Sequence, residues 1–296
     1  MSMKFYIVTP SFNSINWLPC CIRSVADQVC EGIQVHHHIQ DGGSSDGSVK
    51  WLETWKQDHA DTTGYTFTYE SAKDAGMYDA INKAWENLPL DADVTAHLNS
   101  DEQYLPFALS DIAREFVKHP NAEVAIGTYI VVDAQGRYIC HRRPIKPRRW
   151  ISRTVCEIIT CACFHRVSSF LRHGVRFNAC WRAIADVAFY RDLVNSSPRF
   201  LILPHMYTSV FTVTGDNLQW SDTSKAEWAH LMSFEPRWVR KLHAFTYRWS
   251  NLKRILTDAI CSSPDSFSIY LPSRMDRSCV HINKSTCRWS NRTQGS

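Results

Sequence analysis

The chain has 296 residues, 44% of them hydrophobic, and its 33 Lys and Arg against 29 Asp and Glu give a formal charge of +4. This is the composition of a globular protein, and it excludes a disordered chain, a collagen and a small disulfide-stapled fold. The charge is too small to argue for nucleic acid, so no nucleic-acid partner is expected.

The cysteines and the apolar segments indicate the cellular compartment of the protein. Eleven cysteines are present without any C-x-x-C pair, so neither a zinc site nor a disulfide framework is indicated, and free thiols in a reducing compartment are expected. The apolar run over residues 5–8 is too short for a signal-peptide core, and the longest apolar-rich stretches reach about half of the ~20 residues that a membrane span needs. We therefore expect a soluble, cytoplasmic protein.

The first hundred residues alternate β-rich runs with helical patterns, which predicts a parallel sheet built from βαβ units. Strands are predicted over residues 4–9, 34–40, 65–70 and 93–98, and helices over residues 17–28, 45–57 and 78–87. In such sheets ligands bind beyond the carboxyl ends of the strands, so the residues that follow each strand are the first candidates for a site.

The pattern changes after residue 122. Residues 124–133 and 137–142 flank a Gly-containing turn and predict a β-hairpin, and a strand near 158–164, a helix over 184–194 and a strand over 200–203 are predicted next. From Trp238 onward apolar residues recur in alternating steps of four and three through residue 259, which predicts a helix with one apolar face.

Three polar segments follow predicted strands. Leu98-Asn99-Ser100-Asp101-Glu102 is either a solvated acidic turn or a site where one or two carboxylates hold Mg²⁺ or Mn²⁺ while substrate phosphates complete the coordination shell. The glycine-rich turn over residues 41–48 lacks the dinucleotide and P-loop patterns, and a turn with a helix cap explains it except for Asp41, which could accept a hydrogen bond from a nucleobase. In the third segment Gly76 and Asp79 suit the start of a helix, which leaves Asp74 unexplained.

His36-His37-His38 lies within a predicted strand. Consecutive strand residues point to alternate faces, so we expect that the three rings do not converge on one metal ion.

The ordered set of polar motifs resembles glycosyltransferase family 2, in particular its colanic-acid-type bacterial branch. The motifs are Thr9-Pro10-Ser11-Phe12-Asn13, Asp41-Gly42-Gly43-Ser44 with Asp46-Gly47, Asp74-x-Gly76-Met77-Tyr78-Asp79-Ala80-Ile81-Asn82, Leu98-Asn99-Ser100-Asp101, Ala162-Cys163-Phe164-His165-Arg166, and Arg176-Phe177-Asn178 followed by Ala185-Asp186. The resemblance covers roughly residues 3–215. Each motif is weak alone, whereas the whole set in this order is specific.

The resemblance implies an α/β chain with the GT-A fold, a Rossmann-like, mostly parallel sheet flanked by helices. It also implies a glycosyltransferase domain over residues 1–215, with a nucleotide-sugar half at about 1–102 and an acceptor half at about 103–215. Residues 216–296 would then form a C-terminal helical, basic extension with a polar tail.

The same resemblance assigns roles to single residues. Asp186 matches the catalytic base, and Asp101 matches the metal-binding acid of the family's D-x-D motif. The residues expected to bind the donor nucleotide sugar are Thr9, Pro10, Asn13, Asp41, Asp74, Asn99, Ser100 and Asp101. The chain departs from the family pattern where Asn99 replaces the first acid of D-x-D and where Val187-Ala188 replaces an aromatic-acid pair after the base.

These assignments predict an inverting, metal-dependent hexosyl-type glycosyltransferase that uses Mn²⁺ or Mg²⁺. It would transfer a sugar from a nucleoside-diphosphate sugar to a polysaccharide or glycolipid acceptor, and the donor expected is a UDP-sugar. Because of Asn99 and the altered segment after Asp186, a catalytically inactive nucleotide-sugar-binding or scaffold protein of the same fold is the alternative. A nucleotidyltransferase is disfavoured, since no basic triphosphate-binding loop follows the first strand.

The positive charge is concentrated near the C-terminus. Between Pro236 and Thr257 there is no acid but six basic residues, on the segment that carries the apolar stripe. Two interpretations stay open. In the first, residues 236–260 lie on an anionic membrane surface and the protein is peripheral on the inner face of the membrane. In the second, the helix docks its stripe on the catalytic domain and leaves a basic face in solvent.

Overall fold

A computed structural model describes residues 2–215, 217 and 221–289 of the chain. The N-terminal part alternates parallel strands with helices, as predicted. Its elements are β1 (Met3–Ser11), α1 (Leu18–Ala26), β2 (Ile33–Asp41), α2 (Ser48–Asp58), β3 (Tyr65–Ser71), α3 (Met77–Glu86) and β4 (Val94–His97). Each strand and helix predicted in this region is confirmed, with ends that differ by a few residues.

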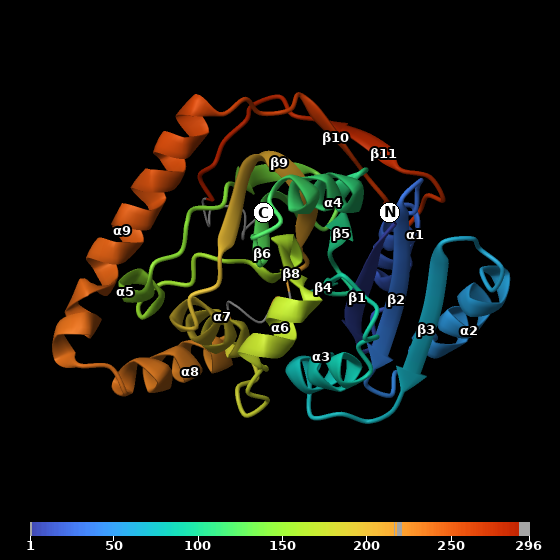
Figure 1. Ribbon diagram of the computed structural model, residues 1–296, viewed down its shortest axis with the longest axis horizontal. Coiled ribbons are helices and arrows are strands. Elements are labelled where there is room, and N and C mark those ends of the chain that lie inside the picture. The colour runs from blue at the N-terminus through green and yellow to red at the C-terminus, as the bar shows by residue number, and fades with distance from the viewer. Residues whose placement is uncertain (1, 216, 218–220, 290–296) are drawn as a thin grey trace.

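The middle of the chain extends the same sheet with strands in both directions. Its elements are β5 (Gln103–Tyr104), α4 (Ala108–Lys118), β6 (Val124–Asp133), β7 (Tyr138–Arg142), α5 (Arg149–Ser152), the 3₁₀ turn η1 (Thr160–Ala162), β8 (Cys163–Arg166), α6 (Val167–His173), α7 (Ala185–Asn195) and β9 (Phe200–Val213). The strand order is β3-β2-β1-β4-β8-β6-β9-β5, with β7 paired to β6. β8 is antiparallel to both of its neighbours. The result is the predicted α/β fold, a mostly parallel sheet flanked by helices (Figure 1).

Alternate residues of β1 point into two hydrophobic cores on opposite faces of the sheet. Phe5 and Ile7 pack with residues of α1 and α4 on one face, whereas Tyr6 and Val8 pack with residues of α3 and α7 on the other. Burying a side chain of this size contributes ~1.5–3 kcal/mol. The two cores fix the positions of the carboxyl ends of the strands, and the candidate site residues follow these ends.

The three consecutive histidines of β2 alternate in the same way. Nε2 of buried His37 lies 2.9 Å from Thr9 Oγ1, whereas His36 and His38 both contact Thr68 Oγ1, at 2.8 and 2.9 Å. The rings therefore do not converge on one ion, as expected.

One predicted strand is wrong at its beginning. The hairpin β6–β7, α7 and the start of β9 confirm the predictions for that region, but residues 160–162 form η1 and the next strand starts only at Cys163. The carbonyl of Glu157 accepts a hydrogen bond from Arg254, and the carbonyl of Ile158 accepts one from the Cys156 thiol. The backbone before η1 is thus committed to contacts other than a sheet ladder.

The C-terminal segment adds α8 (Asp222–Ser233), α9 (Arg237–Ile260) and the hairpin of β10 (Ser266–Ile269) and β11 (Ser278–His281). α9 confirms the helix predicted from Trp238 and runs along the outer edge of the molecule (Figure 1). The hairpin returns to the N-terminal part, where Arg277 pairs with Asp27 at the end of α1. Among the described residues no helix is long and apolar enough to cross a membrane. All eleven cysteines lie within these residues and are free thiols.

Candidate active site

The loops after β1 and β2 lie at the edge of the sheet where the parallel strands end (Figure 1), and hydrogen bonds join them. Asn13 has a left-handed backbone, φ 48°, a conformation that Asn tolerates better than most residues. Its N–H donates to Ser44 Oγ at 2.7 Å, and its Oδ1 accepts the N–H of Ser45 at 2.9 Å. The N–H of Ile15 donates to the Asp46 carboxylate at 2.9 Å. The two loops predicted to bind the donor therefore form one surface.

Asp41 ends β2 and is fully buried. Its Oδ2 accepts the N–H groups of Gly43 and Ser44 and the hydroxyl of Ser71, at 3.0, 2.9 and 2.7 Å, and its Oδ1 accepts the hydroxyl of Ser44. The carboxylate thus shapes the loop, and among the described residues Oδ1 accepts one bond and keeps one acceptor position. The contact of Asp41 with a nucleobase stays a prediction, and the remaining acceptor position of Oδ1 would make that contact.

Thr9 and Pro10 lie buried near the end of β1. Thr9 Oγ1 contacts the ring of His37, and burial lowers the pKa of that histidine to about 3, so the ring is neutral at physiological pH. The Thr9 side chain therefore faces the core. The donor contacts predicted for Thr9 and Pro10 stay predictions.

Asp74 lies against the loop after β2. A Cβ built on Gly42 would come within 2.9 Å of Asp74 Oδ2, so glycine at position 42 leaves room for that carboxylate. Asp74 Oδ1 accepts the N–H of Gly76, which precedes α3, at 2.8 Å. The fold thus brings the residue that the sequence left unexplained next to the two joined loops.

The turn after β4 holds two adjacent carboxylates. Glu102 is fully buried, and its Oε2 accepts the N–H of Asn99 at 2.8 Å. Burial, together with the charge of Asp101, raises the pKa of Glu102, and burial raises the pKa of Asp101. Two negative charges are unfavourable in so confined a place, so the pair favours either a bound proton or a bound cation.

Unpaired oxygen atoms in this turn fit a hard cation. Asn99 Oδ1 and Glu102 Oε1 are buried and have no hydrogen-bond partner among the described residues. Carboxylate and amide oxygens are the ligands that Mg²⁺ and Mn²⁺ prefer, so Asp101 with these two neighbours fits such an ion. In the part of the chain that the structure describes, no group of three or more His, Cys, Asp or Glu side chains forms a metal site. Water and substrate oxygens would have to supply further ligands.

Asp186 stands in the first turn of α7 and contacts the motif that begins α3. The Tyr78 hydroxyl donates to Asp186 Oδ1 over 3.2 Å, and the N–H of Val187 donates to the same oxygen over 2.9 Å. Burial raises the pKa of Asp186 against the effect of these hydrogen bonds. No described residue donates to Oδ2, so that oxygen is open to a hydroxyl group of a substrate.

Two residues that the sequence analysis missed hold the site from the C-terminal side. The Glu227 carboxylate of α8 accepts the backbone N–H groups of residues 182, 183 and 184, at 2.7, 2.9 and 3.2 Å. Asn217 donates from Nδ2 to Asp101 Oδ2 at 3.4 Å and to the carbonyl of Thr212 at 3.1 Å. Neither stands in a motif, and only the fold brings them to Asp186 and Asp101.

The structure gathers the predicted site residues into two neighbouring groups. Asn13, Asp41 and Asp74 surround the joined loops, and residues 99–101 form the turn after β4. Asp186 lies close enough to this turn for its charge to contribute to the raised pKa of Glu102. Acidic groups from both halves of the chain therefore face one region.

The comparisons with known proteins concern the family and the fold of the chain. The family model for glycosyl transferase family 2 matches residues 6–175. A crystal structure of TarS from S. aureus, residues 1–349, in complex with UDP-GlcNAc is similar, with a TM-score of 0.55 and 14% identity. The match covers 78% of this chain and 64% of that structure.

A mannosyltransferase from Pyrobaculum calidifontis, PcManGT, in complex with GDP-Man and Mn²⁺ matches with a TM-score of 0.56 and 12% identity. That match covers 87% of this chain and 72% of the other. No curated protein matches the sequence. At these identities the solved structures establish a shared fold.

Proposed function

The chain belongs to glycosyltransferase family 2, and on that premise we propose that it transfers one sugar from a nucleoside-diphosphate sugar to an acceptor hydroxyl, with inversion at the anomeric carbon. One observation carries the proposal. Asp186, from the acceptor half, accepts a hydrogen bond from Tyr78 of the donor-half motif, and its charge contributes to the raised pKa of Glu102 in the turn after β4. A base beside a nucleotide-sugar site is what such a displacement needs.

In the proposed reaction Asp186 acts through Oδ2. It accepts the proton of the acceptor hydroxyl, whose oxygen attacks the anomeric carbon while the bond to the nucleoside diphosphate breaks on the opposite side. The hydrogen bonds from Tyr78 and Val187 hold the other oxygen and fix the direction of the carboxylate. A single base carboxylate suffices, unlike the pair that glycosidases use.

We propose that Asp101, with Asn99 and Ser100 beside it, holds the donor diphosphate end together with Mn²⁺ or Mg²⁺. The bound ion would supply a Lewis acid that stabilises the charge of the departing diphosphate. The unpaired oxygens of Asn99 and Glu102 support this assignment. The PcManGT structure, which holds GDP-Man and Mn²⁺, supports a divalent ion in this fold.

For the donor we propose a UDP-sugar carrying a hexosyl group, held by the loops of Thr9, Pro10, Asn13, Asp41 and Asp74. The similarity to a TarS structure that holds UDP-GlcNAc supports UDP. The similarity to a structure that holds GDP-Man makes GDP-sugars the necessary comparison. For the acceptor we propose a saccharide on a polysaccharide or lipid carrier, as in the colanic-acid-type branch, handled by a domain that ends near residue 215 and by the extension after it.

The test is a screen of UDP-, GDP- and dTDP-sugars with and without Mn²⁺. Thermal shift reports donor binding, and release of the nucleoside diphosphate reports transfer of the sugar to water or to an added saccharide. A donor that stabilises the protein and is turned over with Mn²⁺ supports the enzyme. Stabilisation without turnover for any donor or acceptor favours the alternative that Asn99 suggests, a nucleotide-sugar-binding protein without catalysis.

A further inference from the structure

α9 has two distinct faces, and the apolar one is turned outward. Its buried residues are Val239, Thr246, Ser250 and Arg254, of which three are polar or charged. Five large residues of the apolar stripe, Trp238, Phe245, Trp249, Leu252 and Leu256, are exposed by 40–59%, whereas Leu242 is half-buried; Ile260, next to the last stripe position, is 82% exposed. A helix that packs on a globular protein normally buries such a stripe. The sequence-based alternative, in which α9 docks its stripe on the catalytic domain, is therefore wrong.

Hydrogen bonds explain why the polar face is the one that docks. Thr246 Oγ1 lies 2.8 Å from Thr154 Oγ1, and the Ser250 hydroxyl donates to Glu157 Oε1 at 2.6 Å. One turn further on, Arg254 donates to the carbonyl of Glu157 at 3.1 Å. These polar groups would lose their partners if the helix turned about its axis to bury the stripe, and a buried polar group without a partner is costly.

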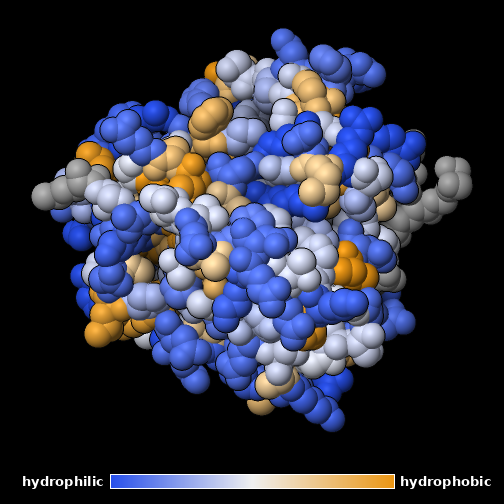
Figure 2. All heavy atoms as spheres, turned by 90° about the vertical axis from the view of Figure 1, so that its right-hand side faces the viewer, coloured by the Kyte–Doolittle hydropathy of each residue, from blue (hydrophilic) through white to orange (hydrophobic). Residues whose placement is uncertain are grey.

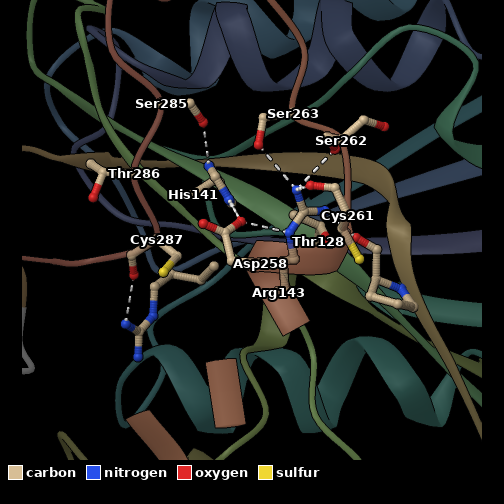
Figure 3. A network of polar contacts seen from close by, with 12 residues as sticks. Thr128, His141, Arg143, Asp258, Cys261, Ser262, Ser263, Ser285, Thr286 and Cys287 are labelled. Carbon is tan, nitrogen blue, oxygen red and sulfur yellow. Dashed lines mark hydrogen bonds and ion pairs between the residues drawn. The ribbon is translucent and has the colours of Figure 1, made fainter. Parts of the chain in front are cut away.

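Both ends of α9 are fixed by buried charges. Before its first turn, Glu235 pairs with Arg153 and with Arg191. In its last turn Asp258 Oδ1 accepts from His141 and, at 2.8 Å, from Arg143 Nε (Figure 3). The fully buried Arg143 side chain also donates to the carbonyls of residues 261 and 262, just beyond the helix. The rotation that turns the stripe outward is thus set along the whole helix.

The charge beside the stripe has one sign. Of the six basic residues between 236 and 257, Arg254 is buried, and the other five are on the exposed sides of the helix, namely Arg237, Arg240, Lys241, Arg248 and Lys253. Lys253 lies over the ring of Trp249, with its ammonium 5.6 Å from the ring centre. Aromatic and aliphatic residues bordered by cations, without acids among them, match the interface of an anionic bilayer.

The face of the molecule opposite α9 carries no comparable apolar stripe among its described residues. The face that Figure 2 shows, on the side away from α9, is mainly hydrophilic, with small separate groups of apolar residues. No helix of the described residues can span a bilayer, so a membrane contact through α9 would lie on the surface.

We propose that the outward face of α9 is a docking surface for an anionic lipid bilayer, in which the stripe enters the headgroup region and the bordering cations contact lipid phosphates. A protein partner is disfavoured, because a contiguous set of cations without acids selects for anionic charge rather than for a mixed polar rim. The proposal deepens the proposed function, since α8, directly before α9, holds the loop before Asp186 through Glu227. A bilayer under α9 would lie next to the elements that position the base, where a lipid-linked acceptor has to arrive.

The test is flotation of the full-length protein with vesicles, without any donor. Vesicles of phosphatidylcholine with roughly a third phosphatidylglycerol should bind the wild type, vesicles of phosphatidylcholine alone should bind it about tenfold less, and added salt should weaken binding. The variant F245S/W249S should lose about tenfold or more of the binding. L90S serves as the matched control, because Leu90 is 92% exposed outside α9 and should bind as the wild type does. Circular dichroism checks that each variant is folded.

The outcomes separate cleanly. A charge variant, K241Q/R248Q, should lose binding to the anionic vesicles and keep the same thermal stability, since both side chains are exposed. Equal binding by wild type and both double variants, or no binding by the wild type, overturns the proposal. A concentration-dependent dimer that F245S/W249S abolishes, without vesicle binding, overturns it in favour of a protein partner. Because no donor is present, failure here leaves the sugar-transfer proposal untouched.

Discussion

The Tyr78 hydroxyl donates a hydrogen bond to Oδ1 of Asp186 over 3.2 Å, and this bond joins the first helix turn of the donor motif to the proposed base. It favours the charged carboxylate in surroundings where burial disfavours it. The state in which Asp186 can accept a proton therefore depends on a residue of α3.

Tyr78→Phe tests this dependence. Without the hydroxyl, the pKa of Asp186 should rise further, so the acid limb of the pH–rate profile shifts to higher pH and the rate near neutrality falls about tenfold. Tyr6→Phe is the matched control, because it also removes a buried hydroxyl bonded to α3, the 2.8 Å bond to the carbonyl of Ala84, without touching the base. Equal pH profiles for the two variants would contradict the role of Tyr78.

Glu227→Gln should lower kcat about tenfold and leave donor binding unchanged. One carboxylate oxygen that accepts backbone N–H groups becomes an amide that donates, so the loop before Asp186 loses part of its support. Asp222→Asn, an exposed acid on the same helix, is the control. Steady-state kinetics with thermal shift for the donor separates the two effects. An unchanged kcat would show that the loop does not need Glu227.

The carboxylate pair after β4 should make metal binding depend on pH. Because the pKa values of Asp101 and Glu102 are raised, the folded protein holds protons that the unfolded chain has released. The free energy of unfolding without metal should therefore fall as pH rises from the ordinary carboxylate pKa to the raised one. Mn²⁺ competes with those protons, so its stabilising effect should be larger at about pH 8 than at about pH 6.

Glu102→Gln should flatten this dependence, since it removes the carboxyl group whose pKa is raised by burial and by the charge of Asp101. Thermal shift with and without Mn²⁺ across the pH range measures it. Glu53→Gln, at an exposed glutamate of α2, should change nothing. A Mn²⁺ effect that is independent of pH in the wild type would rule out the carboxylate pair as the site.

Ser44→Ala should weaken donor binding with little effect on kcat. The Ser44 hydroxyl accepts from Asn13 and donates to Asp41, so its loss removes one of the hydrogen bonds that join the two loops proposed to hold the nucleoside. A decrease in affinity of roughly five- to tenfold corresponds to about one hydrogen bond. Ser110→Ala, which removes an exposed local bond to the carbonyl of Phe107, is the control. Identical donor affinity in both variants would leave the loops without a binding role.

The sequence predicted the parallel N-terminal strands well because their apolar runs and polar ends follow a local period. It missed the 3₁₀ turn at residues 160–162, which follows a segment that α9 holds through the bond from Arg254 to the carbonyl of Glu157. The periodicity over α9 was identified correctly, but the sequence left open which face of the helix packs on the domain. A stripe of apolar residues predicts the buried face of a helix only when no other face makes stronger contacts with the domain. In α9 the face that carries Thr246, Ser250 and Arg254 is the buried one.

The candidate site shows the same limit. Motif spacing identified Asp101 and Asp186 as candidates, but the residues that orient them and shift their pKa values come from elsewhere in the sequence. Tyr78 was assigned to a motif without a partner, and Glu227 stands in no motif at all. Both contacts depend on how α3, α7 and α8 meet, which no local pattern encodes.

The most direct test of the account compares wild type and Asp186→Asn for release of the nucleoside diphosphate from the best donor with Mn²⁺. Asn keeps an oxygen for the bonds from Tyr78 and Val187, so the fold and the donor-induced thermal shift should be retained. Release should fall by roughly 10²–10⁴, the usual contribution of a general base. Release at the wild-type rate would contradict the assignment of Asp186 and with it the proposed mechanism.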